Sequence, residues 1–598
     1  MIDSINVAIG QIRPRKGDYD ENLRRIGGVL AQIAQHDAPP DLVVFPETFV
    51  SGHFVQGGVT ELVVTAGALF RDLATQHEHS AAPPLDVVVG FYEQFDNRVF
   101  NSALYVSLGG AAPRIVHVHR KVFLPTYGLF DEKRFVEEGN EIRAFDTGWG
   151  RAAMGVCEDI WHSIIPTLAV LDGAQVIIVP SAGPARGLAA TSNTSVARPE
   201  TADAWESRVR EVAIEHGVYV VLAQLVGSEG GKSLQGSSTI VAPDGEVVAR
   251  GPAFEDAIVT ATLSPTAIAR TRAHQSSLGD IETKLDILLR GRSRPATLRF
   301  DSHGLDRRGG IPAVTGRAPV IEPGDLPDPM QITPQLAEDW LVSFLRDEVK
   351  VRRGFDRVLV GLSGGVDSAV TAALAAKAFG PKNVVGVRMP YKTSSEESLS
   401  HASDVAAALE IELQTVDISD AVDGYVRAVG DDLDDTRRGN VMARVRMITL
   451  FDLSAKLGAL PLGTGNKTER LLGYFTWHAD DSPPVNPVGD LFKTQVRMLA
   501  RHLGLPDVII DKPASADLVP GQTDEADLGV SYDDADRILH WILNGHRDDA
   551  IVALGFPAET VSLVRRRLDT THWKRNLPTV AVLSDTAIGE GYLRPVDY

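Results

Sequence analysis

Residues 359–368 read L-V-G-L-S-G-G-V-D-S, an apolar run that meets a Ser-Gly-Gly turn and then a helical pattern. The apolar run predicts a buried strand, and the glycines allow the backbone N–H groups of the turn to point into one concavity. A helix that begins there adds the partial positive charge of its N-terminus. The stretch therefore predicts a pyrophosphate cradle that opens a nucleotide-binding α/β domain. It lacks the Gly-Lys-Ser/Thr ending of a Walker loop, so γ-phosphate transfer is the poorer interpretation.

The first half of the chain alternates β-branched runs with helical patterns. Strands are predicted at 5–12, 41–47, 85–93, 102–108, 152–158, 174–182, 218–226 and 238–245. Helices are predicted between them at 20–36, 59–77 and 202–216. This alternation indicates stacked sheets covered by helices.

Composition divides the chain into three parts. A predicted helix at 266–291 is followed by a Gly-, Pro- and Arg-rich stretch that is typical of a linker. A predicted helix at 334–351 then opens the second half. We therefore expect a first domain at 1–265, a connecting part at 266–333 and a second domain at 334–598.

Charge and composition exclude several classes of protein. The 598 residues contain 59 Lys and Arg against 79 Asp and Glu, a formal net charge of −20. Such a surface repels phosphate backbones, so no nucleic-acid partner is expected. No stretch approaches the roughly 20 apolar residues of a membrane span, and the N-terminus does not resemble a signal peptide, so we expect a cytoplasmic protein without a membrane partner. One cysteine, Cys157, excludes an internal disulfide framework and a Cys-rich metal site.

Three residues in the first half carry groups that suit nucleophilic chemistry. Glu47 lies in VVFPET, Lys121 in HRKVFLPTYG and Cys157 in GVCEDIW, each next to a predicted strand. A thiol with a pKa of about 8.5 is only slightly ionised at neutral pH, so it needs a base and a nearby cation. Taken singly, each has a structural interpretation, since an isolated cysteine is usually a small buried hydrophobe and a charged strand end is usually at the surface.

In this order the three motifs resemble the nitrilase superfamily of carbon–nitrogen hydrolases over roughly residues 3–265. The resemblance implies an αββα sandwich with a Glu47–Lys121–Cys157 triad. Glu47 would take the thiol proton, and Lys121 would stabilise the oxyanion as Cys157 attacks an amide carbon and releases ammonia. Glu132 matches a second glutamate that positions the triad, although a solvated helix charge fits it equally well. The glutamine-binding residues that the resemblance implies are Tyr127, Phe130 and Ser181.

The Ser-Gly-Gly-Val-Asp-Ser turn resembles the PP-loop of ATP pyrophosphatases, which cut ATP between the α and β phosphates and activate an acceptor as its adenylate. Four further stretches resemble the NAD synthetase domain: RRGNVMARVRM (437–447), LGTGNKTERLLGYFT (462–476), NPVGDLFKTQVRMLA (486–500) and DKPASADLVPGQTDEADLGVSYDD (511–534). The similarity spans nearly all of 335–545 and implies a Rossmann-like fold. Joined to a nitrilase-like glutaminase, it implies a member of the glutamine-dependent NAD synthetases.

The second resemblance also implies roles for individual residues. The ATP-binding residues would be Ser363, Gly364, Gly365, Asp367, Ser368, Thr464, Lys493 and Ser515. Magnesium prefers hard oxygen donors and keeps several waters, so Asp367 and Glu469 would suffice to hold it. The acceptor-binding residues would be Asn440, Arg444 and Asp480. Asp517 belongs to the Ala-Asp-Leu turn of the second phosphate loop, where a structural role fits equally well.

Two segments depart from the family patterns. After GYFT the NAD synthetase pattern continues with Lys-Tyr-Gly-Asp or Leu-Tyr-Gly-Asp, whereas residues 477–484 read WHADDSPP, in which Asp480 alone still aligns. In the family this segment borders the nicotinate end of the acceptor. In the first half, VPSAGPARG replaces the expected Asn-x-Ser-Ala-Ser-Pro. Drift within the family and a changed acceptor both explain these departures.

The predicted function is an ATP- and magnesium-dependent amide ligase with its own glutaminase. Ammonia released at Cys157 would attack an acyl-adenylate in the second half, which gives an amide, AMP and pyrophosphate. The leading acceptor is deamido-NAD, and the alternative is the same amidation of a different carboxylic acid, for example in specialised metabolism. A third hypothesis, a non-catalytic nucleotide-binding or regulatory protein, is disfavoured by two intact sets of motifs. The resemblance also implies a homodimer or a larger homo-oligomer.

Overall fold

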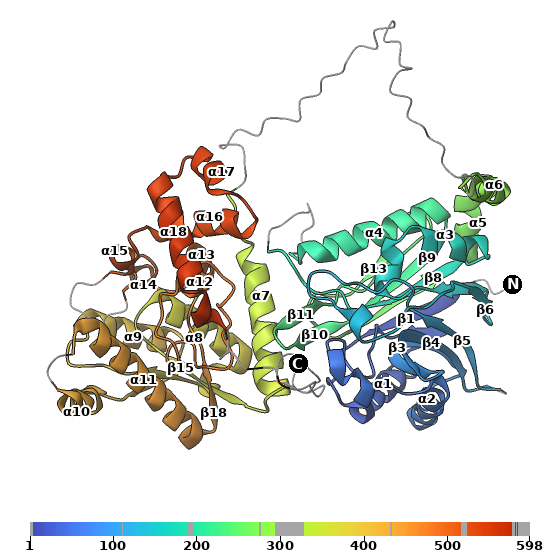
Figure 1. Ribbon diagram of the computed structural model, residues 1–598. Coiled ribbons are helices and arrows are strands. Elements are labelled where there is room, and N and C mark those ends of the chain that lie inside the picture. Colours follow the sequence, from blue (N-terminus) through green and yellow to red (C-terminus); the bar gives the residue numbers. More distant parts are fainter. Residues whose placement is uncertain are drawn as a thin grey trace, which may run out of the picture.

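The computed structural model describes residues 4–110, 112–188, 197–273, 277–292, 328–430, 433–515 and 523–576, together with 581 and 583. These residues form two α/β bodies that lie side by side (Figure 1). Helix α7 (Pro334–Leu345) lies on the side of the second body that meets the first (Figure 1). Among the described helices, none combines the length and apolar character that crossing a membrane requires.

The first body begins with a six-stranded sheet that is parallel in its centre. In spatial order its strands are β14 (Ala257–Leu263), β1 (Ile5–Gln11), β2 (Leu42–Val44), β3 (Leu85–Phe95), β4 (Arg98–Leu108) and β5 (Arg114–Arg120). Helices α1 (Tyr19–Ile33) and α2 (Ala66–Ser80) cover its outer face (Figure 1).

A second six-stranded sheet packs face to face against the first. In spatial order its strands are β13 (Val247–Arg250), β12 (Thr239–Val241), β9 (Tyr219–Gln224), β8 (Val176–Ser181), β7 (Arg151–Met154) and β6 (Ala144–Asp146). Helices α3 (Ile164–Leu171) and α4 (Glu200–His216) cover its outer face (Figure 1). One apolar core joins residues of both sheets, such as Val44 and Val88 with Ile178 and Val221. This confirms the αββα sandwich.

Several predicted elements differ in detail from the observed ones. The helix predicted at 59–77 is a 3-10 turn, η1 (Gln56–Glu61), followed by α2, because the Thr65 hydroxyl caps a new helix by accepting from Ala68 N. The strand predicted at 152–158 ends at Met154, so that Cys157 begins the 3-10 turn η3 (Cys157–Trp161). The helix predicted at 266–291 is described as α5 (Pro265–Ala273) and α6 (Ser277–Arg292), and residues 293–327 of the predicted linker lie outside the described residues.

The second body is built on a four-stranded parallel sheet. In spatial order its strands are β17 (Glu412–Thr415), β16 (Val384–Arg388), β15 (Arg357–Gly361) and β18 (Ala459–Leu462). Alternate residues of β15 enter two different cores, Val358 on one face and Leu359 on the other, so helices bury the sheet on both sides. The strand order reverses direction between β15 and β18, and open α/β sheets bind ligands outside such a switch point.

Helices surround this sheet and extend beyond it. They are α8 (Val366–Phe379), α9 (Glu396–Ala408), α10 (Ser419–Val429), α11 (Asp435–Leu457), α12 (Lys467–Leu472), α13 (Lys493–His502), α14 (Asp507–Ile510), α15 (Asp524–Leu528), α16 (Tyr532–Leu543), α17 (Asp548–Ala553) and α18 (Ala558–Thr570). Short 3-10 turns are η2 (Glu132–Arg134), η5 (Pro381–Asn383) and η6 (His572–Arg575).

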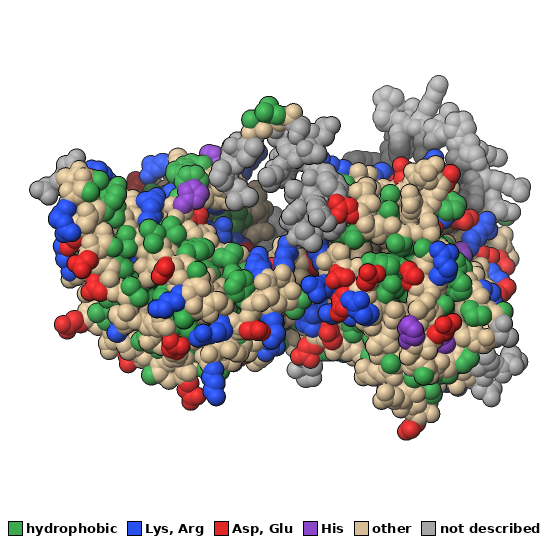
Figure 2. Space-filling view, turned by 90° about the horizontal axis from the view of Figure 1, so that it is seen from below, with side chains coloured by type: hydrophobic (Ala, Val, Ile, Leu, Met, Phe, Trp, Pro, Cys, Tyr) green, Lys and Arg blue, Asp and Glu red, His purple; other side chains and the backbone are tan. Residues whose placement is uncertain are grey.

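The two bodies meet at a hairpin of the first body, β10 (Val226–Glu229) and β11 (Lys232–Gln235). The helix predicted at 334–351 is α-helical only to Leu345 and continues as a π-helical turn, η4 (Arg346–Val351). From this turn the buried Asp347 carboxylate pairs with Arg13 at 3.1 Å. The Gly231 N–H donates to Glu348 Oε1 at 3.1 Å. Figure 2 shows charged side chains of both signs along the boundary between the two bodies.

Candidate active sites

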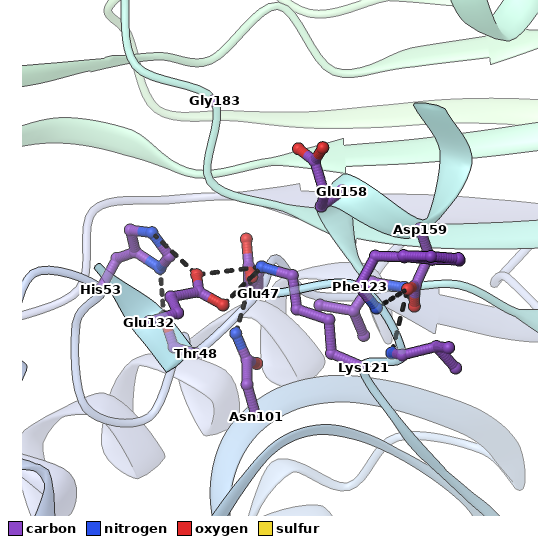
Figure 3. A network of polar contacts seen from close by, with 12 residues as sticks. Glu47, Thr48, His53, Asn101, Lys121, Phe123, Glu132, Glu158, Asp159 and Gly183 are labelled. Atoms are coloured by element: carbon purple, nitrogen blue, oxygen red, sulfur yellow. Dashed lines mark hydrogen bonds and ion pairs between the residues drawn. The ribbon is translucent and has the colours of Figure 1, made fainter. Parts of the chain in front are cut away.

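The buried lysine of the first body, Lys121, lies between two glutamates (Figure 3). Its Nζ is 2.8 Å from Glu47 Oε1 and 2.8 Å from Glu132 Oε2. Lys121 follows β5 and Glu47 follows β2, so the ends of two strands of one sheet bring them together. The Asn101 side chain donates to Glu47 Oε1 at 2.8 Å. Only 10% of the Glu132 side chain is exposed, so this carboxylate is an ion-pair partner and not a solvated helix charge.

Electrostatics keep this pair ionised. Burial alone would raise the pKa of Glu47, but the Lys121 ammonium and the neighbouring His53 hold it below its usual value. Burial would lower the pKa of Lys121, and the charges of Glu132 and Glu47 outweigh this and raise it well above its usual value. A permanent cation therefore lies beside a carboxylate that can still accept a proton.

Cys157 is buried at the start of η3, in a left-handed backbone conformation with φ of 48°. Burial and the Glu47 charge raise the pKa of its thiol well above the usual range, although Lys121, Ser181 and the Ala182 N–H act in the opposite direction. The thiol is therefore protonated at rest. Among the described residues, none hydrogen-bonds to Glu47 Oε2, so this oxygen is available to receive the thiol proton.

The third residue of the Cys-Glu-Asp motif, Asp159, connects the lysine and cysteine segments. Its carboxylate accepts from the N–H of Val156 at 3.0 Å, of Val122 at 3.0 Å and of Phe123 at 2.9 Å (Figure 3). His119 Nε2 contacts the same carboxylate at 2.9 Å. The sequence predicted no role for Asp159, although its place in the motif two residues after the cysteine was a signal.

The glutamine-binding residues predicted for this site differ in position. Phe130 and Glu132 line a cavity of about 30 Å³ together with His53 and Phe54. Tyr127 is 60% exposed, and its hydroxyl donates to Glu158 Oε2 at 2.7 Å. Ser181 is buried at the end of β8, near enough to Cys157 to lower the pKa of its thiol, although its hydroxyl makes no hydrogen bond to the described residues. The structure thus brings Phe130 and Ser181 to the reacting groups and leaves Tyr127 at the surface.

In the second body, a cavity of about 340 Å³ opens at the carboxyl ends of β15 and β18. The predicted residues that line it are Ser363, Gly365, Asp367, Ser368, Thr464, Glu469, Asp480, Lys493 and Ser515. Gly364 shapes the turn instead, because its φ is +78° and a Cβ there would lie 2.4 Å from the Ser398 carbonyl oxygen. The Ser368 hydroxyl donates to the Gly365 carbonyl at 2.9 Å and closes the turn.

Lys493 is the buried cation of this cavity. Its Nζ is 2.5 Å from Asp367 Oδ2 and 3.4 Å from Glu469 Oε1. The Asn466 side chain donates to Asp367 Oδ1 at 2.9 Å. Burial, reinforced by the Asp367 charge and only partly offset by Lys493, raises the pKa of Glu469 to about 8. A third acidic side chain, Asp524, lines the same cavity near this group.

Asp536 is the counterpart of Asp159 in this site, because it too is a buried carboxylate that accepts hydrogen bonds from two segments carrying site residues. It is fully buried and accepts from the Thr494 N–H at 2.9 Å, from the Thr494 hydroxyl at 2.8 Å and from the Thr468 hydroxyl at 2.5 Å. Thr494 follows Lys493, and Thr468 precedes Glu469. Asp536 thus connects the segments that carry the cation and one of its partners, a role that the sequence did not reveal.

The predicted acceptor residues lie around one turn. Asn440 and Arg444 both lie on α11. Among the residues that the structure describes, these two are not part of the lining of the 340 Å³ cavity. The Thr476 hydroxyl donates to Asn440 Oδ1 at 2.9 Å, and Arg444 donates to the Trp477 carbonyl at 3.2 Å. Asp480 lines the cavity and accepts from the Thr476 N–H at 2.7 Å. Asp517 lies outside the described residues.

Comparisons with known proteins match the two bodies to two different families. Residues 6–273 match the family model described as carbon-nitrogen hydrolase, and residues 338–578 match the one described as NAD synthase. An NH3-dependent NAD+ synthetase of Chlorobaculum tepidum is 48% identical over 255 residues, which are 42% of this chain and 91% of the relative. A glutamine-dependent NAD+ synthetase of Thermotoga maritima is 29% identical over 611 residues, 99% of this chain and 98% of the relative. The fold is also that of the glutamine-dependent NAD+ synthetase from Acinetobacter baumannii solved with ADP, with a TM-score of 0.69, 23% identity and coverage of 99% and 98%.

Proposed function

The chain belongs to the NAD synthetase family, and we propose that its two bodies act together as a glutamine-dependent NAD synthetase. We assign residues 1–265 to the glutaminase, 266–333 to the connection and 334–598 to the synthetase. The proposal rests on the presence of two sites in one chain. In the first, an ionised Glu47–Lys121 pair lies next to Cys157. In the second, Lys493 contacts Asp367, just after the 363–365 turn at the switch point of a parallel sheet.

In the glutaminase, glutamine enters next to Cys157 with its side-chain amide. As Sγ attacks the amide carbon, the thiol proton moves to Glu47 Oε2, and the developing oxyanion is stabilised by the Lys121 ammonium. The proton on Glu47 then leaves with the nitrogen as ammonia, and a thioester remains on Cys157. Water attacks the thioester with Glu47 as base, which releases glutamate and restores the thiol.

In the synthetase, the acceptor carboxylate attacks the α-phosphorus of ATP and pyrophosphate leaves, so that an acyl-adenylate forms. The backbone N–H groups of the 363–365 turn and the N-terminus of α8 would hold the pyrophosphate, and Lys493 would offset its charge. Ammonia then attacks the acyl carbon and AMP leaves. The products are NAD, AMP and pyrophosphate.

The donor set of the large cavity fits a magnesium ion. Asp367 and Glu469 offer hard carboxylate oxygens, and burial raises the pKa of Glu469 to about 8, which a bound cation would lower again. We propose that these two residues hold Mg²⁺. When bound, Mg²⁺ neutralises charge on the phosphate oxygens.

Deamido-NAD is the acceptor that the family favours. The unusual 477–484 segment suggested a different carboxylic acid as an alternative acceptor. This alternative is not favoured, because NAD synthetases are 48% identical to the synthetase half and 29% identical to the whole chain. A non-catalytic protein is disfavoured because both sites keep their reacting groups in contact.

We further propose that the protein is a homo-oligomer. Exposed apolar side chains on α10 and α11, namely Tyr425, Val429, Ile448 and Phe451, support association through this part of the second body. Light scattering coupled to size-exclusion chromatography should give at least twice the 64.4 kDa of one chain. A mass equal to one chain would contradict this part of the proposal.

Amide-labelled glutamine tests the proposed function directly. With ATP, Mg²⁺ and deamido-NAD, the wild type should release AMP and transfer the label to NAD, as followed by mass spectrometry. Cys157→Ala should lose this reaction with glutamine and keep it with ammonium. Hydrolysis of glutamine without AMP or NAD would overturn the assignment of the acceptor, and the absence of both activities would overturn the proposed function.

A further inference from the structure

His53, for which the sequence predicted no role, lies buried in the wall of the glutaminase site. It follows Glu47 on the loop after β2, and its side chain is 2% exposed. Ligand atoms of Glu47, His53 and Glu132 all lie within 4.8 Å of one another. His53 also lines the small cavity beside Phe130 and Glu132. It therefore belongs to the same cluster as the reacting groups.

Contacts from several elements fix the position of the His53 backbone and ring. The Glu229 carboxylate accepts from the His53 N–H at 3.1 Å and from the Phe54 N–H at 2.8 Å. The Tyr92 hydroxyl donates to the His53 carbonyl at 2.9 Å. The ring packs edge-on against Phe54 and Phe130, with centroid distances of 4.9 and 6.0 Å. A ring held in this way has a defined direction for each of its nitrogens.

The two ring nitrogens face different partners (Figure 3). Nδ1 lies 3.3 Å from the hydroxyl of Thr48, which directly follows Glu47 and has a left-handed φ of 49°. Nε2 lies 3.8 Å from Glu132 Oε1. If the Thr48 hydroxyl donates to Nδ1, the ring proton is on Nε2 and faces the Glu132 carboxylate.

Glu132 needs such a partner because of where its charge lies. Two carboxylates approach the single Lys121 ammonium to 2.8 Å each, so they repel one another across it. An N–H that faces Glu132 from the cavity side opposes this repulsion and keeps the carboxylate on Lys121. Lys121 then keeps its direction toward the oxyanion that forms on Cys157.

We propose that His53 is a positioning residue of the glutaminase reaction, which acts through its Nε2–H on Glu132 and thereby on Lys121. This inference rests on the proposed glutaminase function. It assigns to His53 a role in the chemical step and none in binding the rest of glutamine. A change at His53 should therefore lower kcat and leave KM nearly unchanged.

Two amide substitutions separate the ring nitrogens. The side-chain N–H₂ of Gln reaches the position of Nε2, whereas that of Asn reaches only the position of Nδ1. We expect His53→Asn to lower the kcat of glutamine hydrolysis roughly 10- to 100-fold, as for loss of a residue that orients a reacting group. His53→Gln should retain most of the wild-type kcat.

Ammonium-dependent NAD formation by the same variants shows that the chain is folded, and it should equal that of the wild type. As a matched control, His77→Asn replaces another buried histidine of the first body, whose Nε2 contacts the Pro83 carbonyl at 3.0 Å. This control should keep the wild-type kcat. Equal losses in His53→Asn and His53→Gln, or a rise in KM with an unchanged kcat, would overturn the role of Nε2. A wild type without glutaminase activity would overturn the proposed function, and this inference with it.

Discussion

Two buried lysines, one in each body, lie between carboxylates in different ways. Lys121 is 2.8 Å from one oxygen of each of two glutamates. Lys493 is 2.5 Å from Asp367 and 3.4 Å from Glu469. Glu132, a partner of the first lysine, lines a cavity of about 30 Å³, whereas the second lysine itself lines one of about 340 Å³.

The difference shows how each site prepares for its substrate. The first site is tightly packed, its ammonium donates to both oxygens of Glu132 and to one of Glu47, and the other oxygen of Glu47 is ready to receive a proton. The second site is wide and unevenly paired, and the pKa of Glu469 remains at about 8. Amide hydrolysis brings a neutral group to a site whose charges are already in place. Adenylation brings a triphosphate and its cation to a site where burial keeps Glu469 largely protonated at neutral pH, so this carboxyl group would lose its proton when a cation binds.

The lysines should give the largest effects, and the two effects should fall on different activities. Lys121→Met should lower glutamine hydrolysis by about 10³-fold or more, because the oxyanion loses its cation, and should leave ammonium-dependent NAD formation intact. Lys493→Met should abolish AMP formation with either nitrogen source. Steady-state assays of glutamate and AMP distinguish the two, and loss of both activities in the Lys121 variant would break the comparison.

Gly364 tests whether the second site depends on its backbone more than the first. Gly364→Ala should raise the KM for ATP or lower kcat so that kcat/KM falls about 100-fold, since a Cβ would clash with the Ser398 carbonyl at 2.4 Å and the left-handed φ is strained. Gly458→Ala is the matched control, because Gly458 also has a positive φ but nothing lies within 4 Å of its Cβ position. An ATP kcat/KM that is equally low in the control would assign the loss to general instability.

Asp159 should have a smaller effect, confined to the first site. Asp159→Asn keeps the shape of the side chain but gives up one acceptor oxygen, so one of the segments beside Lys121 and Cys157 is released. We expect glutamine hydrolysis to fall about 10-fold, and the free energy of unfolding to fall by about 1 to 3 kcal/mol. Glutaminase assays and thermal melting measure both. An unchanged kcat with a lowered melting temperature would show that Asp159 contributes stability alone.

The smallest expected effect concerns the pH dependence of folding stability, to which Asp536 contributes. Burial raises the pKa of this carboxyl to about 6 in the folded chain, although hydrogen bonds from Thr468 and Thr494 act in the opposite direction. The folded state therefore binds the proton more tightly than the unfolded state, so this contribution to stability is complete below about pH 4 and is lost as the pH rises through 6. It amounts to at most about 3 kcal/mol.

Melting temperatures between pH 4.5 and 7 should accordingly change less with pH in Asp536→Asn than in the wild type. Asp490→Asn, at an exposed position, should keep the wild-type slope. A slope in Asp536→Asn as steep as that of the wild type would show that another group titrates in this range.

Local sequence patterns predicted the fold and the reacting groups, because the signals for both come from residues that are close together in the sequence. The β-branched runs predicted stacked sheets covered by helices, and the turn at 363–368 predicted the start of a nucleotide-binding α/β domain. Glu47, Lys121 and Cys157 were found through the motif that surrounds each of them. The structure brings Lys121 into contact with Glu47 and places both next to the thiol.

What remained hidden depends on contacts between distant segments. Asp536 is 68 residues from Thr468, and Glu229 is 176 residues from His53, so neither pair is visible in any local pattern. The π-helical turn at Arg346–Val351 was equally hidden, because its residues have an ordinary helical pattern. Asn440 and Arg444 were predicted at the acceptor, and in this structure they contact the 476–477 turn beside the cavity.

The single cysteine of the chain makes it possible to measure what fraction of the molecules has a competent glutaminase site. Because Cys157 is the one thiol among 598 residues, every covalent thiol adduct on the intact chain reports the occupancy of one glutaminase site. The raised pKa and burial of this thiol should make ordinary alkylating reagents react slowly at neutral pH. An electrophilic glutamine analogue that recruits Glu47 as base should instead react quickly and stoichiometrically. The mass of the intact chain then becomes a titration of competent sites in any preparation.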